Sequence, residues 1–74
     1  MPRMFRKPLF GDRHIELRFE DGEVCIYATN TGLQKIIAFC NQLLENPKIG
    51  HVHLEDYELL TRASLEGVIA LFED

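Results

Sequence analysis

Residues 13–28 read RHIELRFEDGEVCIYA, and this stretch predicts a β-hairpin. Apolar and polar residues alternate in its first half, which is the pattern of a half-buried strand. Asp21 and Gly22 at its centre are typical of a two-residue type I′ turn, and such a turn fixes which residues face one another. We predict pairs of Ile15 with Ala28, Glu16 with Tyr27, Leu17 with Ile26, Arg18 with Cys25, Phe19 with Val24, and Glu20 with Glu23. Apolar residues therefore meet on one face of the hairpin.

The hairpin is followed by the pattern of an amphipathic helix. Thr29, Asn30 and Gly32 are residues common at helix starts and turns. Pro47 ends the pattern, because proline lacks the N–H that a helix interior needs. The sequence predicts a helix over residues 31–45. Its apolar stripe, with Phe39 at the border, consists of Leu33, Ile36, Ile37, Cys40, Leu43 and Leu44.

Two further segments complete the domain. Residues 51–56, HVHLED, alternate again and predict a third strand. Residues 64–74 fit either a helix that starts at Ser64 or a strand over residues 68–72 that is buried on both faces. Gly67 and the β-branched Val68 and Ile69 favour the strand.

This order of elements predicts an α+β fold of two layers. One helix lies on one face of a four-stranded, mostly antiparallel sheet, with strand order 2-1-4-3 or, as the alternative, 2-1-3-4. Residues 1–12 are expected to form a loosely ordered basic arm, and residues 13–74 a single domain. A single helix leaves the other sheet face open, so Cys25, Tyr27 and Phe72 are candidates for a self-association face in a homodimer.

Length and charge limit the classes of function. The chain has 74 residues and a formal net charge of −4. Its apolar runs are too short to cross a bilayer, and its first residues lack the apolar core of a signal peptide, so we expect a cytoplasmic protein that does not bind membranes. An acidic chain without a stripe of Lys and Arg is not typical of a nucleic-acid binder. The charge favours a basic protein partner instead.

Few residues suggest chemistry of their own. His51 and His53 would lie on the same side of a strand, which makes them weak candidates for a metal site, but no cluster of further ligands accompanies them. We expect them to be surface histidines and expect no metal or cofactor. Cys25 and Cys40 are predicted to be buried free thiols. No catalytic signature is present, and we predict that the protein is not an enzyme.

The clearest candidate for partner binding is the acidic segment, which consists of Glu55, Asp56, Tyr57 and Glu58. An aromatic side chain flanked by carboxylates can anchor a basic protein surface, because Tyr is enriched at interface hot spots. The alternative interpretation is that Tyr57 covers an edge of the core.

Four features occur in an order that resembles a known family. They are Asp21-Gly22, the helix opening Asn30-Thr31-Gly32-Leu33, the stretch HVHLEDY at residues 51–57, and Ser64 followed by Val68-Ile69. Over residues 13–72 this order is similar to the small bacterial immunity protein 32 family. The resemblance implies a protein that neutralises a toxin by binding it, without enzymatic activity.

Overall fold

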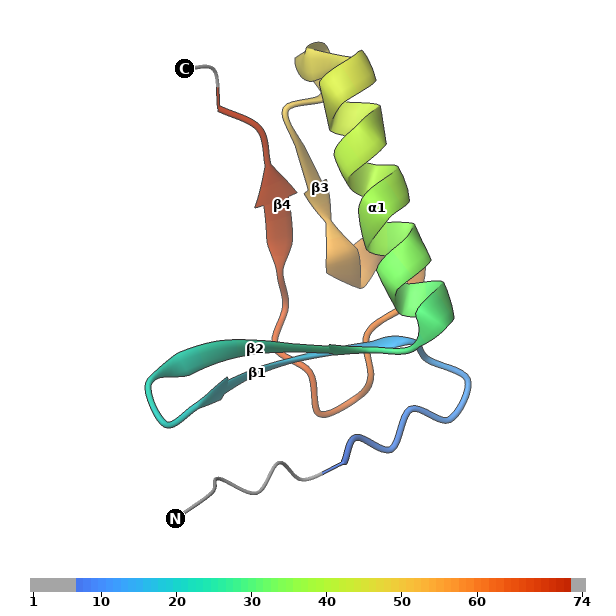
Figure 1. Ribbon diagram of the computed structural model, residues 1–74, viewed down its shortest axis with the longest axis vertical. Helices are drawn as coiled ribbons and strands as arrows, with labels where there is room; N and C mark the ends of the chain where they lie inside the picture. Colours follow the sequence, from blue (N-terminus) through green and yellow to red (C-terminus); the bar gives the residue numbers. More distant parts are fainter. Residues whose placement is uncertain (1–6, 73–74) are drawn as a thin grey trace.

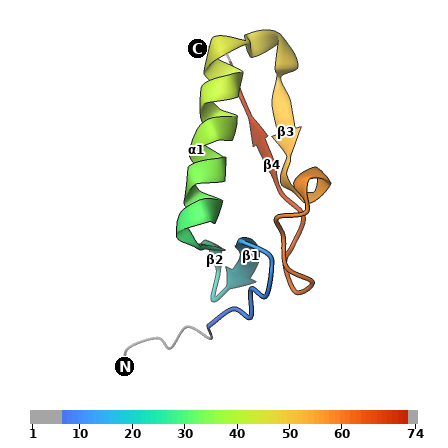
Figure 2. The same cartoon turned by 90° about the vertical axis from the view of Figure 1, so that its right-hand side faces the viewer.

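The computed structural model describes residues 7–72 and shows a small α+β fold (Figure 1). Strands β1 (Ile15–Glu20) and β2 (Glu23–Ala28) form a hairpin, and helix α1 (Asn30–Glu45) follows directly. A 3-10 turn (Pro47–Ile49), strand β3 (His51–His53), a second 3-10 turn (Leu54–Tyr57) and strand β4 (Val68–Ala70) complete the chain. Figure 2 shows α1 beside the β3–β4 pair, with the hairpin across the base of both. Of the predicted basic arm, residues 1–6 lie outside the described residues.

The hairpin has the predicted register. All six predicted pairs are present, from Ile15 opposite Ala28 to Glu20 opposite Glu23. Asp21 and Gly22 have φ angles of 51° and 80°, and a type I′ turn requires positive φ at both central positions. The predicted pairing is therefore confirmed. It could be predicted because the turn residues and the alternation of apolar and polar residues specify the same pairing.

The helix is also confirmed, but its buried stripe is narrower than predicted. The hydroxyl of Thr29 accepts a hydrogen bond from the N–H of Gly32 at 3.1 Å and caps the helix. Phe39 and Leu43 are buried, and Ile36 packs against the core. The other members of the predicted stripe are exposed: Leu33, Ile37, Cys40 and Leu44. Burial of Cys40 was therefore a wrong prediction.

The second pair of strands is antiparallel, with His51 opposite Ala70 and His53 opposite Val68. A strand over Val68–Ala70 confirms the choice of strand over helix for that segment, but the strand is shorter than the predicted 68–72 and is not buried on both faces, because Val68 and Ala70 are exposed. The predicted third strand is shorter than expected and ends at His53. Leu54 turns into the core, and Tyr57 turns against Phe39 on the same side. Residues three apart in a strand would point to opposite faces, so this arrangement requires the 3-10 turn.

The predicted four-stranded sheet is not present. The structure contains two separate two-stranded sheets, β1–β2 and β3–β4, so neither predicted strand order occurs. The cause is the segment over residues 59–65, which occupies the outer edge of β1. Ile15 donates to the carbonyl of Leu59 at 3.0 Å and accepts from Thr61 at 3.0 Å, and Leu65 donates to the carbonyl of Leu17 at 2.9 Å. That edge is no longer free to pair with β3 or β4.

The core lies where the hairpin, the helix and the β3–β4 pair meet. Within the described residues, its buried apolar side chains are Ile15, Leu17, Phe39, Leu43, Val52, Leu54 and Leu59. No helix in residues 7–72 has the length and apolar character that crossing a membrane requires.

Candidate functional site

Of the acidic segment, Glu55 has a structural role. One of its carboxylate oxygens accepts from the backbone N–H of Gly67 at 3.3 Å, and the other lies 3.1 Å from Nδ1 of His53. A hydrogen bond from its own backbone N–H, the bond from Gly67 and the nearby His53 lower the pKa of this carboxyl. Glu55 thus ties the start of the 3-10 turn to the residue that precedes β4.

Tyr57 is the anchor of the exposed part of the segment. Its ring is half-exposed and lies 4.8 Å, centroid to centroid, from the ring of Phe39 at an interplanar angle of 43°. Phe39 is only 6% exposed, so Tyr57 rests against a side chain that the core holds in place. Asp56 and Glu58 on either side are exposed. The structure therefore presents one supported aromatic ring between two solvent-exposed carboxylates.

His51 and His53 lie together, as their spacing in a strand predicts. Their ring centroids are 4.9 Å apart and the planes meet at 88°. In residues 7–72, no group of three or more His, Cys, Asp or Glu side chains is arranged to hold a metal ion. Besides the ring contact with His51, His53 contacts the carboxylate of Glu55.

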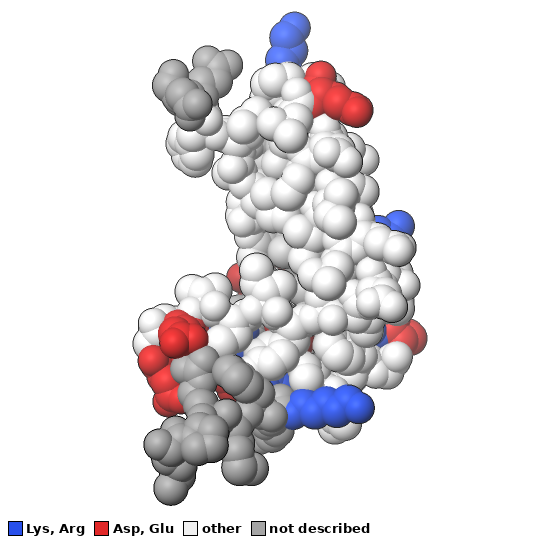
Figure 3. Space-filling model, in the orientation of Figure 1, with Lys and Arg blue, Asp and Glu red and all other residues white. Residues whose placement is uncertain are grey.

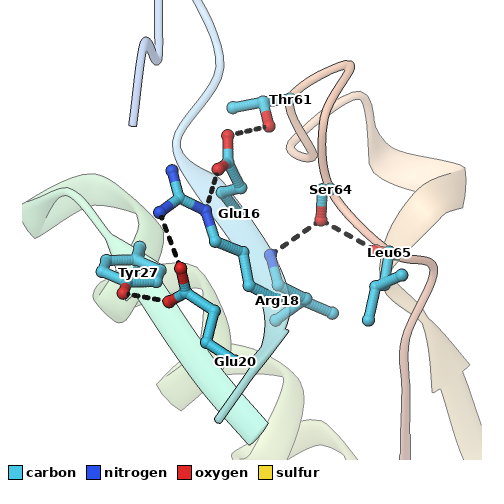
Figure 4. A network of polar contacts seen from close by, with 8 residues as sticks. Glu16, Arg18, Glu20, Tyr27, Thr61, Ser64 and Leu65 are labelled. Atoms are coloured by element: carbon cyan, nitrogen blue, oxygen red, sulfur yellow. Dashed lines mark hydrogen bonds and ion pairs between the residues drawn. The ribbon is translucent and has the colours of Figure 1, made fainter. Parts of the chain in front are cut away.

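A polar network covers the hairpin face that was expected to be open (Figure 4). Glu16, only 2% exposed, pairs with Arg18 and accepts a hydrogen bond from the hydroxyl of Thr61. Arg18 also lies 3.6 Å from Glu20, and its guanidinium lies 4.5 Å from the centroid of the Tyr27 ring. Tyr27 donates from its hydroxyl to Glu20 at 2.6 Å. The charges of this face are therefore paired within the chain.

The network shifts the pKa values of two of its members. The hydrogen bond to Glu20, with burial as a second cause, raises the pKa of Tyr27 to about 12. Burial alone would lower the pKa of Arg18, but the hydrogen bond to Glu16 and the charges of Glu16 and Glu20 raise it overall. Both shifts favour the protonated forms of these two side chains.

A hollow of about 500 Å³ lies beside this network. Its lining includes Lys7, Glu16, Arg18, Thr61 and Arg62. Glu16, Arg18 and Thr61 also belong to the network, in which Glu16 and Arg18 neutralise each other. The network was not predicted from the sequence, although the predicted pairing of Glu16 with Tyr27 placed two of its members side by side.

The predicted self-association residues do not form one surface. Tyr27 belongs to the polar network, and Cys25 is half-buried on the same strand with its thiol 3.9 Å from the carbonyl of Glu23. Phe72 is 84% exposed, but it follows β4 at the end of the molecule opposite the hairpin (Figure 1). The structure thus brings together Cys25 and Tyr27 and leaves Phe72 apart from them.

Several large exposed apolar side chains form what we term the apolar face. Phe19, Val24 and Ile26 belong to the hairpin, and Val68 belongs to β4. A groove of about 270 Å³ between the hairpin, α1 and β4 is lined mainly by apolar residues, these four and Ile36 among them, and also by the charged Arg18 and Glu66. We include in this face the exposed apolar side chains of α1, so that its members are Phe19, Val24, Ile26, Leu33, Ile37, Leu44 and Val68, each at least 50% exposed. The sequence pattern had predicted that the apolar face residues of the hairpin and the helix lie toward the core: Phe19, Val24, Ile26, Leu33, Ile37 and Leu44.

The charge distribution sets this face apart. In the view of Figure 3, the surface over α1 and β4 is free of Lys, Arg, Asp and Glu side chains, which lie at its borders and around the hairpin. Contiguous exposed apolar surface of this kind marks an interaction site in a folded protein.

No protein-family model, curated protein or solved structure matches this chain. The resemblance to the immunity protein 32 family therefore stays a prediction that rests on the quoted residues. The geometry offers two surfaces for recognition: the acidic segment, and the apolar face.

Proposed function

We propose that this protein is a non-enzymatic binding protein that recognises a basic protein surface through Asp56, Tyr57 and Glu58. The observation that supports the proposal is the placement of Tyr57, half-exposed against the buried Phe39 and between two exposed carboxylates. In the form that the family resemblance suggests, the partner is a toxin domain and binding neutralises it.

The segment is held in place before any partner arrives. Glu55 ties it to Gly67, and Phe39 supports the ring of Tyr57. A side chain that is already ordered loses less conformational entropy on binding, which increases the affinity obtained from each contact. Tyr also combines a large apolar ring with a hydroxyl, which suits a contact that is partly exposed to water.

Charge supports a basic partner. The chain has 12 acidic and 8 basic residues, and no described residue forms an ion pair with Asp56 or Glu58. Carboxylates at the rim of an interface accelerate the association of oppositely charged proteins and contribute to the choice of partner. The proposal therefore predicts binding that weakens as salt is added.

Capture experiments with matched variants test the proposal. The immobilised chain is exposed to lysate of its host, and bound proteins are identified by mass spectrometry. One variant combines Asp56→Lys with Glu58→Lys, which changes two exposed side chains and leaves Tyr57 and Phe39 in place. A second variant is Tyr57→Ala. The control is Glu45→Lys at the exposed end of α1.

We expect a basic protein to bind the unchanged chain and the Glu45→Lys control. The same protein should not bind the Asp56→Lys, Glu58→Lys variant or the Tyr57→Ala variant. Co-expression of the captured protein with and without the chain then shows whether binding protects cells. Retention of the same protein by the Asp56→Lys, Glu58→Lys variant would show that the acidic segment is not the binding site.

A further inference from the structure

Helix α1 carries a second apolar stripe beside the one that packs on the core. Leu33, Ile37, Cys40 and Leu44 follow one another at intervals of four, three and four residues. This is the spacing of the a and d positions of a coiled coil, which places all four side chains along one seam. Leu33, Ile37 and Leu44 are 50%, 59% and 67% exposed, and Cys40 is exposed as well.

This seam is separate from the buried stripe. Ile36, Phe39 and Leu43 face the core, and the seam lies about a quarter turn around the helix from them. The helix therefore has two apolar stripes, of which the fold of one chain covers one. An apolar helix surface of this width is typical of a helix that packs against two neighbours.

We infer that the seam is covered by the α1 helix of a second copy of this chain, packed antiparallel about a twofold axis. The seam is symmetric about the level between Ala38 and Phe39. An antiparallel pair therefore places Leu33 opposite the partner's Leu44, and Ile37 opposite the partner's Cys40. Every apolar layer meets an apolar layer, which is the self-complementarity that a twofold interface requires.

The residues beside the seam do not oppose this pairing. Gln34 and Asn41 flank it on the outer side, and the only charged residues of the helix are Lys35 and Glu45. Neither lies at a position next to the seam. Two copies with a net charge of −4 repel each other least across a surface without charges, and in Figure 3 the charged side chains near α1 lie at the borders of its surface.

The rest of the apolar face extends the contact. In an antiparallel pair, the end of the partner's helix lies toward the hairpin, whose Val24 and Ile26 are 77% and 60% exposed. The exposed fractions over the apolar face correspond to an area on the order of 800 Å², which is what each partner buries in a standard stable interface. The groove between the hairpin and β4 is part of the same surface.

Packing against a second copy would also stabilise this small domain. The two sheets have two strands each, and a two-stranded sheet has little stability of its own. Dimerisation through the apolar face would bury side chains at the junction of both sheets and the helix. Small domains with limited cores are commonly stabilised by oligomerisation.

Sedimentation of the full chain over a range of concentrations tests the inference, with Ile37→Glu as the variant and Lys35→Glu as its control. Both changes place a carboxylate on an exposed helix position, but only Ile37 is on the seam. We expect a mass of twice 8.6 kDa for the unchanged chain and for Lys35→Glu, and 8.6 kDa for Ile37→Glu. Circular dichroism checks that both variants keep the helix.

A crosslink tests the antiparallel arrangement even if Ile37→Glu unfolds. In a Cys25→Ser background, the Ile37→Cys substitution places a thiol opposite the partner's Cys40. Mild oxidation should then give a covalent dimer joined by two equivalent 37–40 disulfides. Lys35→Cys in the same background should not yield a 35–40 disulfide.

A monomer at all concentrations, or a dimer that Ile37→Glu leaves unchanged, would overturn the inference. The Asp56→Lys, Glu58→Lys variant should remain dimeric, which separates this result from the proposed partner binding.

Discussion

The hydroxyl of Thr61 donates a hydrogen bond to the carboxylate of Glu16, which lies 45 positions earlier in the chain. The same carboxylate pairs with Arg18, and the side chain of Glu16 is 3% exposed. This hydrogen bond holds the segment over residues 59–65 against β1. A buried carboxylate is stable only when its partners are present, so the position of the segment and the charge of Glu16 depend on each other.

Removal of that carboxylate should destabilise the fold. In Glu16→Ala, the half-buried guanidinium of Arg18 loses its closest partner, and the hydroxyl of Thr61 loses its acceptor. We expect the free energy of unfolding to fall by about 2 kcal/mol, because the hydroxyl of Thr61 loses a hydrogen bond to a charged group while Arg18 keeps its contacts with Glu20 and Tyr27. Urea denaturation measures the change.

Glu45→Ala provides the comparison, since Glu45 is exposed at the end of α1. A surface change of this kind should alter the free energy of unfolding by less than about 0.5 kcal/mol. Equal stability of the two variants would show that the network adds nothing to the fold.

Gly32 permits the close approach of the helix to the hairpin. A Cβ atom at this position would lie 2.2 Å from the carbonyl oxygen of His14 and 3.1 Å from Cβ of Ala28. Gly32→Ala should therefore force the helix away from β1, even though Ala favours helices. We expect a loss of about 2 kcal/mol, typical of an overpacked site.

In a chain of this length, such a loss lowers Tm by about 10 °C. Thermal unfolding followed by circular dichroism measures it, with Gln42→Ala at an exposed helix position as the control. An unchanged or higher Tm for Gly32→Ala would mean that the helix start can shift without loss.

The hairpin and the helix could be predicted because local residues determine them. Asp21 and Gly22 select the turn, the turn selects the register, and Thr29 and Pro47 bound the helix. Each of these signals lies within a few residues of the structure that it specifies. The agreement between them is why the prediction was correct.

The separation into two sheets could not be predicted, because the outer edge of β1 is occupied by a segment that is far from β1 in the sequence. The segment over residues 59–65 pairs with β1 through backbone groups and has no alternating pattern to announce a strand. The acidic segment was recognised from its composition, but the turn of Tyr57 toward Phe39 depends on where the helix lies. For the same reason, the sequence showed a wide apolar stripe on α1 without showing which half the core covers.

Ser64 holds the segment over residues 59–65 against β1, and its hydroxyl can be tested directly. The oxygen accepts from the N–H of Leu17 at 2.8 Å, and the hydroxyl donates to the carbonyl of Leu65 at 2.8 Å. Ser64→Ala leaves the N–H of Leu17 without that acceptor. We expect a loss of about 1 kcal/mol in urea denaturation, the usual net contribution of one hydrogen bond. Ser64→Thr keeps the hydroxyl and should recover most of the loss; a stability equal to that of Ser64→Ala would argue that the hydroxyl is not the cause.

Alkaline titration should reveal the contact between Tyr27 and Glu20. This contact raises the pKa of Tyr27 from its usual value of 10.0 to about 12, because the phenolate would lie beside a carboxylate. Between those two pH values the phenol is ionised in the unfolded chain and protonated in the folded one. The folded state then binds more protons, so the free energy of unfolding falls as the pH rises through this window.

In a Tyr57→Phe background, Tyr27 is the only tyrosine, and its ultraviolet tyrosinate absorbance reports the titration. Glu20→Gln should return the midpoint toward 10.0 and weaken the fall in stability, and an unchanged midpoint would assign the shift to a different neighbour.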